Sequence, residues 1–239
     1  MHVSGWIGIV FVGLCGAGCS PEPVYTPLPD AAYMPLMKGM FWLYQVDSTV
    51  ITANVETRYG YQLQVEVTDS ISPVPGEVTY LLSRSRRQGA SAPFAPLVTW
   101  RVQRTAQELI LRAGNTAYVA LAFPIIRSRD WNGNAYNTLG GNDFCEGSGP
   151  CDVYTYTQVR VPRELGEKTF SDVVTVEEGN TPDRLVRFDL RMSHYARDIG
   201  LIERDYQVLN YCSQPACYGR QFVDRGIVFS QRLISYGRR

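Results

Sequence analysis

The sequence has few of the residues on which most hydrolytic active sites depend. It contains two histidines, His2 and His194, and no Gly-x-Ser-x-Gly segment. His2 lies in an N-terminal segment that we expect to be removed, so a nucleophile and base arrangement would have His194 alone to draw on. His194 shares the face of an alternating segment with Leu190 and Met192, which favours a buried, hydrogen-bonded histidine. We expect a protein that is not an enzyme.

Acidic residues give no clearer sign of catalysis. A glycosidase needs two carboxylates that face one cleft, and sequence spacing does not place them. The acidic residues of the C-terminal half stand among arginines, which we interpret as cross-strand charge pairs on a solvent-exposed face. They are Asp183, Asp189, Asp198, Glu203 and Asp205.

An excess of either charge is also absent, because the 23 basic residues balance the 23 acidic ones. Nucleic-acid binding needs a basic surface excess, so we expect no nucleic-acid partner. One basic cluster occurs at 83–87. It could contact phosphate groups, but a solvated strand edge whose charges oppose aggregation is the commoner explanation.

The sequence has one long apolar run, Trp6–Leu14, and it is shorter than the ~20 residues that span a bilayer as a helix. The small residues Gly16, Ala17 and Gly18 follow it and precede Cys19. This order is typical of a lipoprotein signal peptide, so we expect residues 1–18 to be removed and Cys19 to carry acyl chains such as palmitate. The alternative is an ordinary secretory signal, cut near the same place without lipid.

Export divides the chain into three expected parts. Removing 18 of the 239 residues leaves 221, enough for one all-β domain with a sizeable core. Four prolines lie within Pro21–Asp30, so we expect residues 19–32 to be an extended, lipidated tether without helix. Residues 33–239 would form a single β domain. The lipid would hold it at the outer membrane, facing the periplasm or displayed on the cell surface.

Four cysteines remain after processing, and all lie in segments rich in Gly, Pro and Ser: Cys145, Cys151, Cys212 and Cys217. In an oxidising compartment, local bridges that close two loop tips are the simplest of the three connectivities. A metal site is disfavoured, because neither pair has the two-residue spacing of zinc ligands and His194 is distant in sequence. We expect no cofactor and no metal.

Apolar and polar residues alternate along most of the chain. In 61–67, Tyr61, Leu63, Val65 and Val67 share one face while polar residues share the other. Period two predicts half-buried antiparallel strands, and no window supports a long helix. About ten such segments predict an antiparallel meander that forms a strongly curved sheet or an up-and-down barrel. They lie at about 42–46, 61–67, 78–82, 98–102, 109–113, 116–123, 153–161, 170–177, 184–195, 200–209 and 227–236.

The longest irregular segment is 127–152. Asp130, Asn132 and Asn134 have the spacing that opens a calcium loop, but position 135 is alanine where that loop requires glycine. Trp131 would either cover one end of the sheet or line a ligand mouth, and covering is the commoner role. The candidate binding loop comprises Trp131, Asn132, Asn134, Tyr136 and Asn137.

Three pairs of segments together resemble a group of uncharacterised predicted lipoproteins common in Bacteroidota. They are Tyr33–Gly39 with Phe41–Asp47, Phe123-Pro124 with Trp131–Asn137, and Tyr195–Arg197 with Ile199–Arg204. The resemblance implies an exported, lipid-anchored β-protein. It brings no catalytic residues, and Gly200 is expected to mark a bulge or tight bend.

Three functions follow as hypotheses. The first is a non-enzymatic envelope protein that binds another envelope component through loops or a sheet edge. The second is a carrier of an apolar ligand inside a curved or closed sheet. The third is a glycan binder or glycoside hydrolase that uses Trp100, Trp131 and nearby carboxylates.

Overall fold

The computed structural model describes residues 29–74, 77–137, 153–183 and 185–239. Thirteen strands and one short 3-10 helix make up the ordered elements of these residues. They are η1 (Pro29–Tyr33), β1 (Met40–Thr52), β2 (Val55–Val74), β3 (Glu77–Arg87), β4 (Ala95–Pro96), β5 (Trp100–Arg104), β6 (Glu108–Ala113), β7 (Thr116–Ala122), β8 (Asp130–Asn132), β9 (Val153–Leu165), β10 (Lys168–Pro182), β11 (Arg187–Ala196), β12 (Gly200–Tyr211) and β13 (Val223–Arg238).

The strands form one antiparallel sheet in the order β7-β6-β5-β3-β2-β1-β13-β12-β11-β10-β9-β8, with β4 paired to β3. Each half of the chain is therefore a meander, and the pairing of β1 with β13 joins the halves. The predicted class, an all-β antiparallel meander in a strongly curved sheet, is confirmed. The eleven predicted segments correspond to strands, and the prediction missed only the short β4 and β8.

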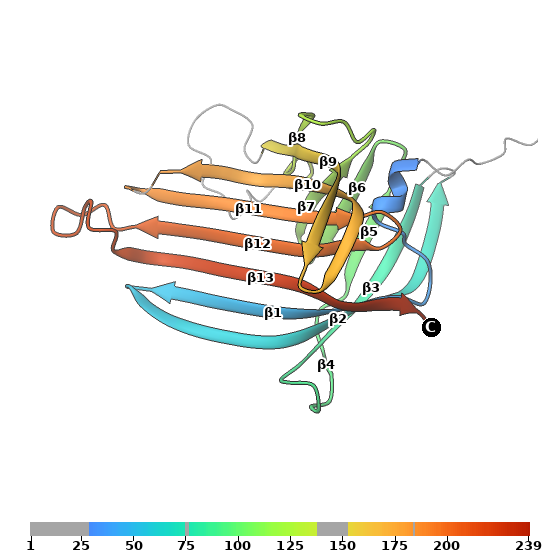
Figure 1. Ribbon diagram of the computed structural model, residues 1–239, viewed down its shortest axis with the longest axis horizontal. Coiled ribbons are helices and arrows are strands. Elements are labelled where there is room, and N and C mark those ends of the chain that lie inside the picture. Colours follow the sequence, from blue (N-terminus) through green and yellow to red (C-terminus); the bar gives the residue numbers. More distant parts are fainter. Residues whose placement is uncertain (1–28, 75–76, 138–152, 184) are drawn as a thin grey trace, which may run out of the picture.

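The sheet curls until its two ends almost meet. In Figure 1, β3, β5, β6 and β7 pass behind β10–β13. We call the line where the edge strands β7 and β8 approach each other the seam, and isolated hydrogen bonds cross it instead of a ladder. The Val119 amide donates to the Gly133 carbonyl at 2.8 Å, and Trp131 Nε1 donates to the Val119 carbonyl at 2.8 Å. The Tyr156 hydroxyl adds bonds of 3.0 Å to the backbone amide and carbonyl of Ala122.

The main core fills the inside of the curl, because the inward positions of each strand are apolar. On β1 the inward residues Met40, Trp42, Tyr44 and Val46 are all buried. Trp42 is fully buried, and its Nε1 donates to the Ile199 carbonyl at 2.6 Å. Gly200 follows with φ +105°, and a Cβ there would lie 3.2 Å from Trp42 Nε1. The tight bend expected at Gly200 is therefore present, and its small residue leaves room for the indole.

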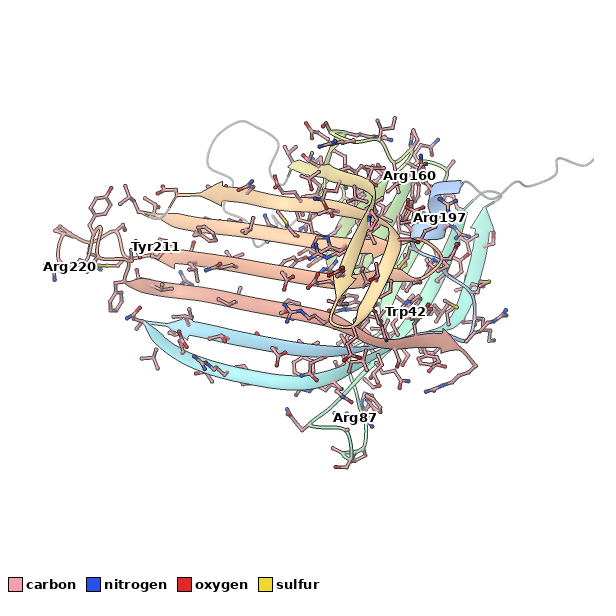
Figure 2. The ribbon with its side chains drawn as sticks, in the orientation of Figure 1. Trp42, Arg87, Arg160, Arg197, Tyr211 and Arg220 are labelled. Carbon is pink, nitrogen blue, oxygen red and sulfur yellow. A yellow bond between two sulfur atoms is a disulfide. The ribbon has the colours of Figure 1, made fainter. Side chains whose placement is uncertain are left out.

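Several strands extend beyond the curled part of the sheet. Figure 1 shows β1, β2 and β10–β13 running well past β3 and β5–β7. A small cluster of Ile51, Leu209 and Val223 is buried there, apart from the main core. Tyr211 and Arg220 lie at the far tip in Figure 2, next to the loop that the disulfide between Cys212 and Cys217 closes.

The extended conformation expected for the tether, residues 19–32, is wrong for its last four residues, and residues 19–28 lie outside the described residues. Residues 29–32 belong to η1 and are held against the sheet, instead of being extended. The Asp30 carboxylate accepts a bond from the Ile125 amide at 2.8 Å and lies 3.8 Å from the Arg160 guanidinium. Figure 2 shows Arg160 and Arg197 beside this turn. The bond from Ile125 joins η1 to the segment after β7, and the buried ring of Tyr33 anchors the end of η1 in the main core.

Helices of a length and hydrophobicity that would let them cross a bilayer do not occur among the described residues.

Candidate functional site

A cavity of about 60 Å³ lies inside the curl, and we call it the interior cavity. It is partly open, and its walls are mostly apolar. Its lining includes Met34, Trp42, Tyr44, Leu63, Val65, Leu82, Arg84, Trp100, Val102, Leu111, Arg204 and Gln231. Aliphatic and aromatic side chains with a few polar groups are the usual lining of a small-molecule site.

The alternation of the strands explains why arginine lines this cavity. On β3, Tyr80 and Leu82 point inward, so the next position of the same parity, Arg84, points inward too. On the opposite wall, Arg204 of β12 and Gln231 of β13 are direct cross-strand partners and therefore share a face. The interior cavity thus receives two guanidinium groups from opposite sides.

Arg84 has no partner of opposite charge in the described part of the chain. Its Nε is buried without a hydrogen bond, and its guanidinium carbon lies 3.6 Å from the centre of the Trp100 ring. Burial lowers the pKa of Arg84 from its ordinary value, and the charge of Arg204 acts in the same direction. This is a correction to the sequence analysis, which placed the cluster at 83–87 on a solvated edge. β3 is paired on both sides, and Arg84 faces the interior.

Arg204, in contrast, is neutralised. It lies 3.7 Å from the buried carboxylate of Glu178, and its Nε donates to Ser193 Oγ at 2.9 Å. Burial alone would lower the pKa of Arg204, but Tyr206 and Glu178 raise it above its ordinary value. The Tyr206 and Ser193 hydroxyls also donate to Glu178. The cavity therefore holds one compensated cation and one uncompensated cation.

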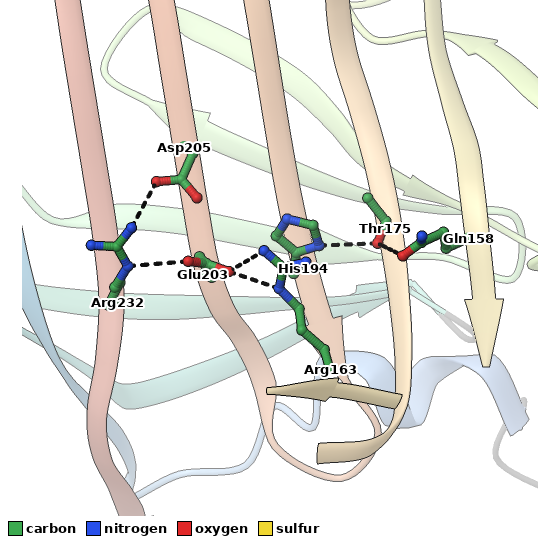
Figure 3. Close-up of polar contacts among 7 residues, drawn as sticks. All are labelled: Gln158, Arg163, Thr175, His194, Glu203, Asp205 and Arg232. Carbon is green, nitrogen blue, oxygen red and sulfur yellow. Dashed lines mark hydrogen bonds and ion pairs between the residues drawn. The ribbon is translucent and has the colours of Figure 1, made fainter. Parts of the chain in front are cut away.

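A second polar cluster lies on the outer face, where the end of the β9–β10 hairpin folds over β11–β13 (Figure 3). The Glu203 carboxylate accepts hydrogen bonds from Arg163 Nε at 2.7 Å and from Arg232 Nε at 3.1 Å. Arg163 belongs to β9 and Arg232 to β13, so one carboxylate links the hairpin to the sheet. We call this the outer cluster; it comprises Gln158, Arg163, Thr175, His194, Glu203, Asp205 and Arg232.

The sequence analysis placed these carboxylates on a solvent-exposed face. Glu203 is only 5% exposed because the hairpin covers it, and Asp189 is 4% exposed. Burial alone would raise the pKa of Glu203, but its bonds to Arg163 and Arg232 hold it below the ordinary value. The predicted cross-strand pairing is present for Glu203 and Asp205, whereas Asp189 pairs with arginines of its own strand. The predicted exposure is wrong for Glu203 and Asp189 and correct for Asp183 and Asp198.

His194 is buried in the outer cluster, as its face predicted, and its Nδ1 lies 3.0 Å from Thr175 Oγ1. Burial lowers the pKa of His194 to about 4, and the Arg163 charge adds to this effect. His194, Glu203 and Asp205 could together offer three metal ligands. Because Glu203 already binds two guanidinium groups, a metal ion would have to displace them, and the donor set fits an ion-pair network better.

The candidate binding loop lies at the seam. Trp131 stacks on Tyr156 with ring centres 4.5 Å apart, which is the covering role that the sequence analysis preferred. Asn132 Oδ1 accepts the Asn134 amide at 2.9 Å, and the Tyr136 hydroxyl donates to Glu108 at 2.8 Å. Asn137 Nδ2 lies 3.5 Å from Asn134 Oδ1. These side chains bind one another and the sheet, and they do not line the interior cavity; their role as a binding loop stays a prediction.

The remaining predicted residues divide into two groups. Cys212 and Cys217 form the local disulfide that their spacing favoured, with Cα atoms 5.8 Å apart. Cys19, Cys145 and Cys151 lie outside the described residues. A cavity inside the sheet was raised as the carrier hypothesis, but the residues that line it were not assigned from the sequence, although the run Tyr80, Leu82, Arg84 carried the signal for them.

Comparisons with solved structures found three matching chains, including the two that follow. One is a predicted exported protein with a YmcC-like fold from Bacteroides fragilis NCTC 9343, with 8% identity, a TM-score of 0.45, and coverage of 85% of this chain and 98% of that one. The other is a predicted lipoprotein from Parabacteroides distasonis ATCC 8503, with 10% identity, a TM-score of 0.39, and coverage of 86% and 98%. No protein-family model and no curated sequence matches this chain.

Proposed function

We propose that this chain is an exported, lipid-anchored, non-enzymatic envelope protein that binds a small apolar ligand in its interior cavity. Export is supported by the small residues before Cys19 and by the disulfide between Cys212 and Cys217, since disulfides persist in oxidising compartments. This is the carrier hypothesis; binding of another envelope component through loops or a sheet edge stays a separate prediction.

The interior cavity is the observation that carries this proposal. Its volume of about 60 Å³ would hold roughly four to six water-sized groups, at about 10–15 Å³ each. That is the size of a short alkyl segment, and it is far below the 300–1,000 Å³ or so of a site for a drug-sized molecule. The remainder of a longer ligand would extend out of the cavity through its open side.

The cavity favours the carrier over the glycan hypothesis. Trp100 lines the cavity, whereas Trp131 lies at the seam and is absent from the lining. Glycan platforms use exposed aromatic rings, and the two tryptophans named for that role do not share one site. Glu178, the partner of the lining residue Arg204, is also bound by Ser193 and Tyr206.

The test uses a neutral probe, 6-bromohexanol, whose bromine quenches tryptophan fluorescence on contact. The full mature chain would be purified from envelopes and held in phosphatidylcholine nanodiscs, with empty nanodiscs as the reference. We expect saturable quenching that Trp100→Phe reduces and Trp131→Phe preserves. Quenching that rises linearly with probe concentration, as for free tryptophan in solution, would contradict the proposal.

A further inference from the structure

The interior cavity contains a charge that the protein leaves unbalanced. Arg84 is half-buried, its Nε has no acceptor, and none of the ion pairs among the described residues includes it. A buried charge without a partner is unfavourable, and proteins normally pair such groups or place them in water. The other cation of the cavity, Arg204, has Glu178 as its partner and so leaves no free carboxylate for Arg84.

The stacking of Arg84 explains how the charge is held. One flat face of its guanidinium lies on the Trp100 ring, at 3.6 Å from the ring centre. Stacking uses the face of the group and leaves the N–H donors around its edge available. A planar set of donors held in one orientation is suited to two parallel hydrogen bonds with a carboxylate or phosphate.

The neighbours of Arg84 determine what such an anion would be attached to. The rest of the lining near β3 and β5 is aliphatic, including Leu82, Val102 and Leu111. Leu82 lies two positions before Arg84 on the same face, and Val102 is the cross-strand partner of Leu111. A ligand whose anionic end meets Arg84 would therefore place an adjoining apolar segment against these three side chains.

We infer that Arg84 is the anion-binding residue of the interior cavity and that the ligand is an anionic amphiphile, with a carboxylate or phosphate group joined to an alkyl chain. This inference rests on the proposed function and specifies the chemistry of its ligand. Arg84 binds the anion directly, while Trp100 positions its guanidinium.

The test is calorimetric titration of the full mature chain, in phosphatidylcholine nanodiscs at pH 7, with three ligands that share one tail: hexanoate, hexyl phosphate and hexanol. We expect at least one anion to bind tenfold or more tightly than hexanol, because hydrogen bonds to a charged group are about twice as strong as neutral ones. The two anions distinguish a carboxylate source from a phosphate source.

Arg84→Met keeps a side chain of similar length without charge, and we expect it to abolish the preference for the anion, so that the ratio of anion affinity to hexanol affinity falls to about one. Arg101→Met is the matched control, because Arg101 lies on the neighbouring strand but is exposed on the outer face. Arg84→Lys keeps the charge without the planar donors and should retain only part of the preference.

The outcomes separate the two claims. Equal affinities of the wild-type chain for hexanoate, hexyl phosphate and hexanol would overturn the role of Arg84 and leave the proposed function standing. Absence of saturable binding by all three would overturn both. Because the wild-type comparison needs no variant, the inference stays falsifiable even if Arg84→Met does not fold.

Discussion

The guanidinium of Arg84 lies flat on the indole of Trp100, with its central carbon 3.6 Å from the ring centre. The two residues come from adjacent strands, where Trp100 pairs with Leu82 and Arg84 is two residues further along β3. The stack fixes a cation inside an apolar cavity without neutralising it. A protein selected for stability alone has little reason to keep such a charge, so the site is a place where function and stability conflict.

Arg84→Met should therefore stabilise the ligand-free protein. Removing an unpaired, partly buried charge and filling its place with an apolar side chain is expected to raise the free energy of unfolding by about 1 kcal/mol, after the loss of the contact with Trp100. Urea denaturation of the wild type and the variant measures the difference. Arg101→Met should change the value by less than about 0.5 kcal/mol. A loss of stability in Arg84→Met would identify Arg84 as a structural residue instead.

Stability should depend on pH through His194. Its pKa in the folded protein is about 4, against 6.5 when unperturbed, because burial disfavours the charged imidazolium. Between these values the unfolded chain binds a proton that the folded chain does not, so stability falls as the pH drops from about 6.5 toward 4. The shift predicts a loss of about 2 kcal/mol between pH 7.5 and pH 5.

His194→Gln keeps a hydrogen-bonding side chain beside Thr175 but removes the titration. Denaturation curves across this pH range should show a flatter profile for the variant than for the wild type. Asp205, whose pKa is raised by burial, is present in both proteins, so the flattening reports on His194 together with its interaction with Asp205. Identical pH profiles would show that His194 titrates normally in the folded state.

Gly133→Ala should open the seam. A Cβ at this position would lie 2.4 Å from ring atoms of Tyr154, and the Gly133 carbonyl is the acceptor for Val119. Relieving the clash must move either the ring or the backbone bond, at a cost of about 1–3 kcal/mol. Gly60→Ala is the control, since its Cβ would meet only Asp47 Oδ1 at 3.4 Å. Thermal unfolding of both variants tests this, and equal melting temperatures would contradict the account of the seam.

Glu203→Gln should loosen the β9–β10 hairpin. The substitution leaves Arg163 and Arg232 facing each other without the carboxylate that joins them, and breaking a buried ion pair costs about 3 kcal/mol. Hydrogen exchange should rise first in the hairpin end around Arg163. For comparison, Glu56→Gln breaks the exposed pair with Arg58 and should cost less than about 1 kcal/mol. Equal losses of stability from the two substitutions would show that the outer cluster does not hold the β9–β10 hairpin against the sheet.

The strands could be read from the sequence because alternation is a local property. Tyr61, Leu63 and Val65 show it on β2: Leu63 is buried in the core, and Tyr61 and Val65 are partly buried against it. The curl of the sheet and its seam depend on contacts between distant residues, such as Trp131 with Tyr156, which no local pattern reveals. His194 was correctly expected to be buried and hydrogen-bonded, but the hairpin that covers it was not foreseen.

Arg84 shows where the reasoning from sequence failed. Its parity with Tyr80 and Leu82 placed it on the inward face, yet the neighbouring arginines at 86 and 87 made a solvated edge the simpler interpretation. The neighbouring arginines predicted that the Arg84 side chain is exposed to solvent, whereas the alternation of the strand predicted that it faces the interior. Alternation was the better guide, because β3 has paired neighbours on both sides and its faces are fixed by them.

The most direct test of the account is a crystal structure of the protein with 6-bromohexanoate, in which anomalous scattering locates the bromine. The account predicts one bromine site among Leu82, Val102 and Leu111, with the carboxylate within hydrogen-bond distance of Arg84. A bromine bound elsewhere on the protein, with Arg84 still unpaired, would contradict it.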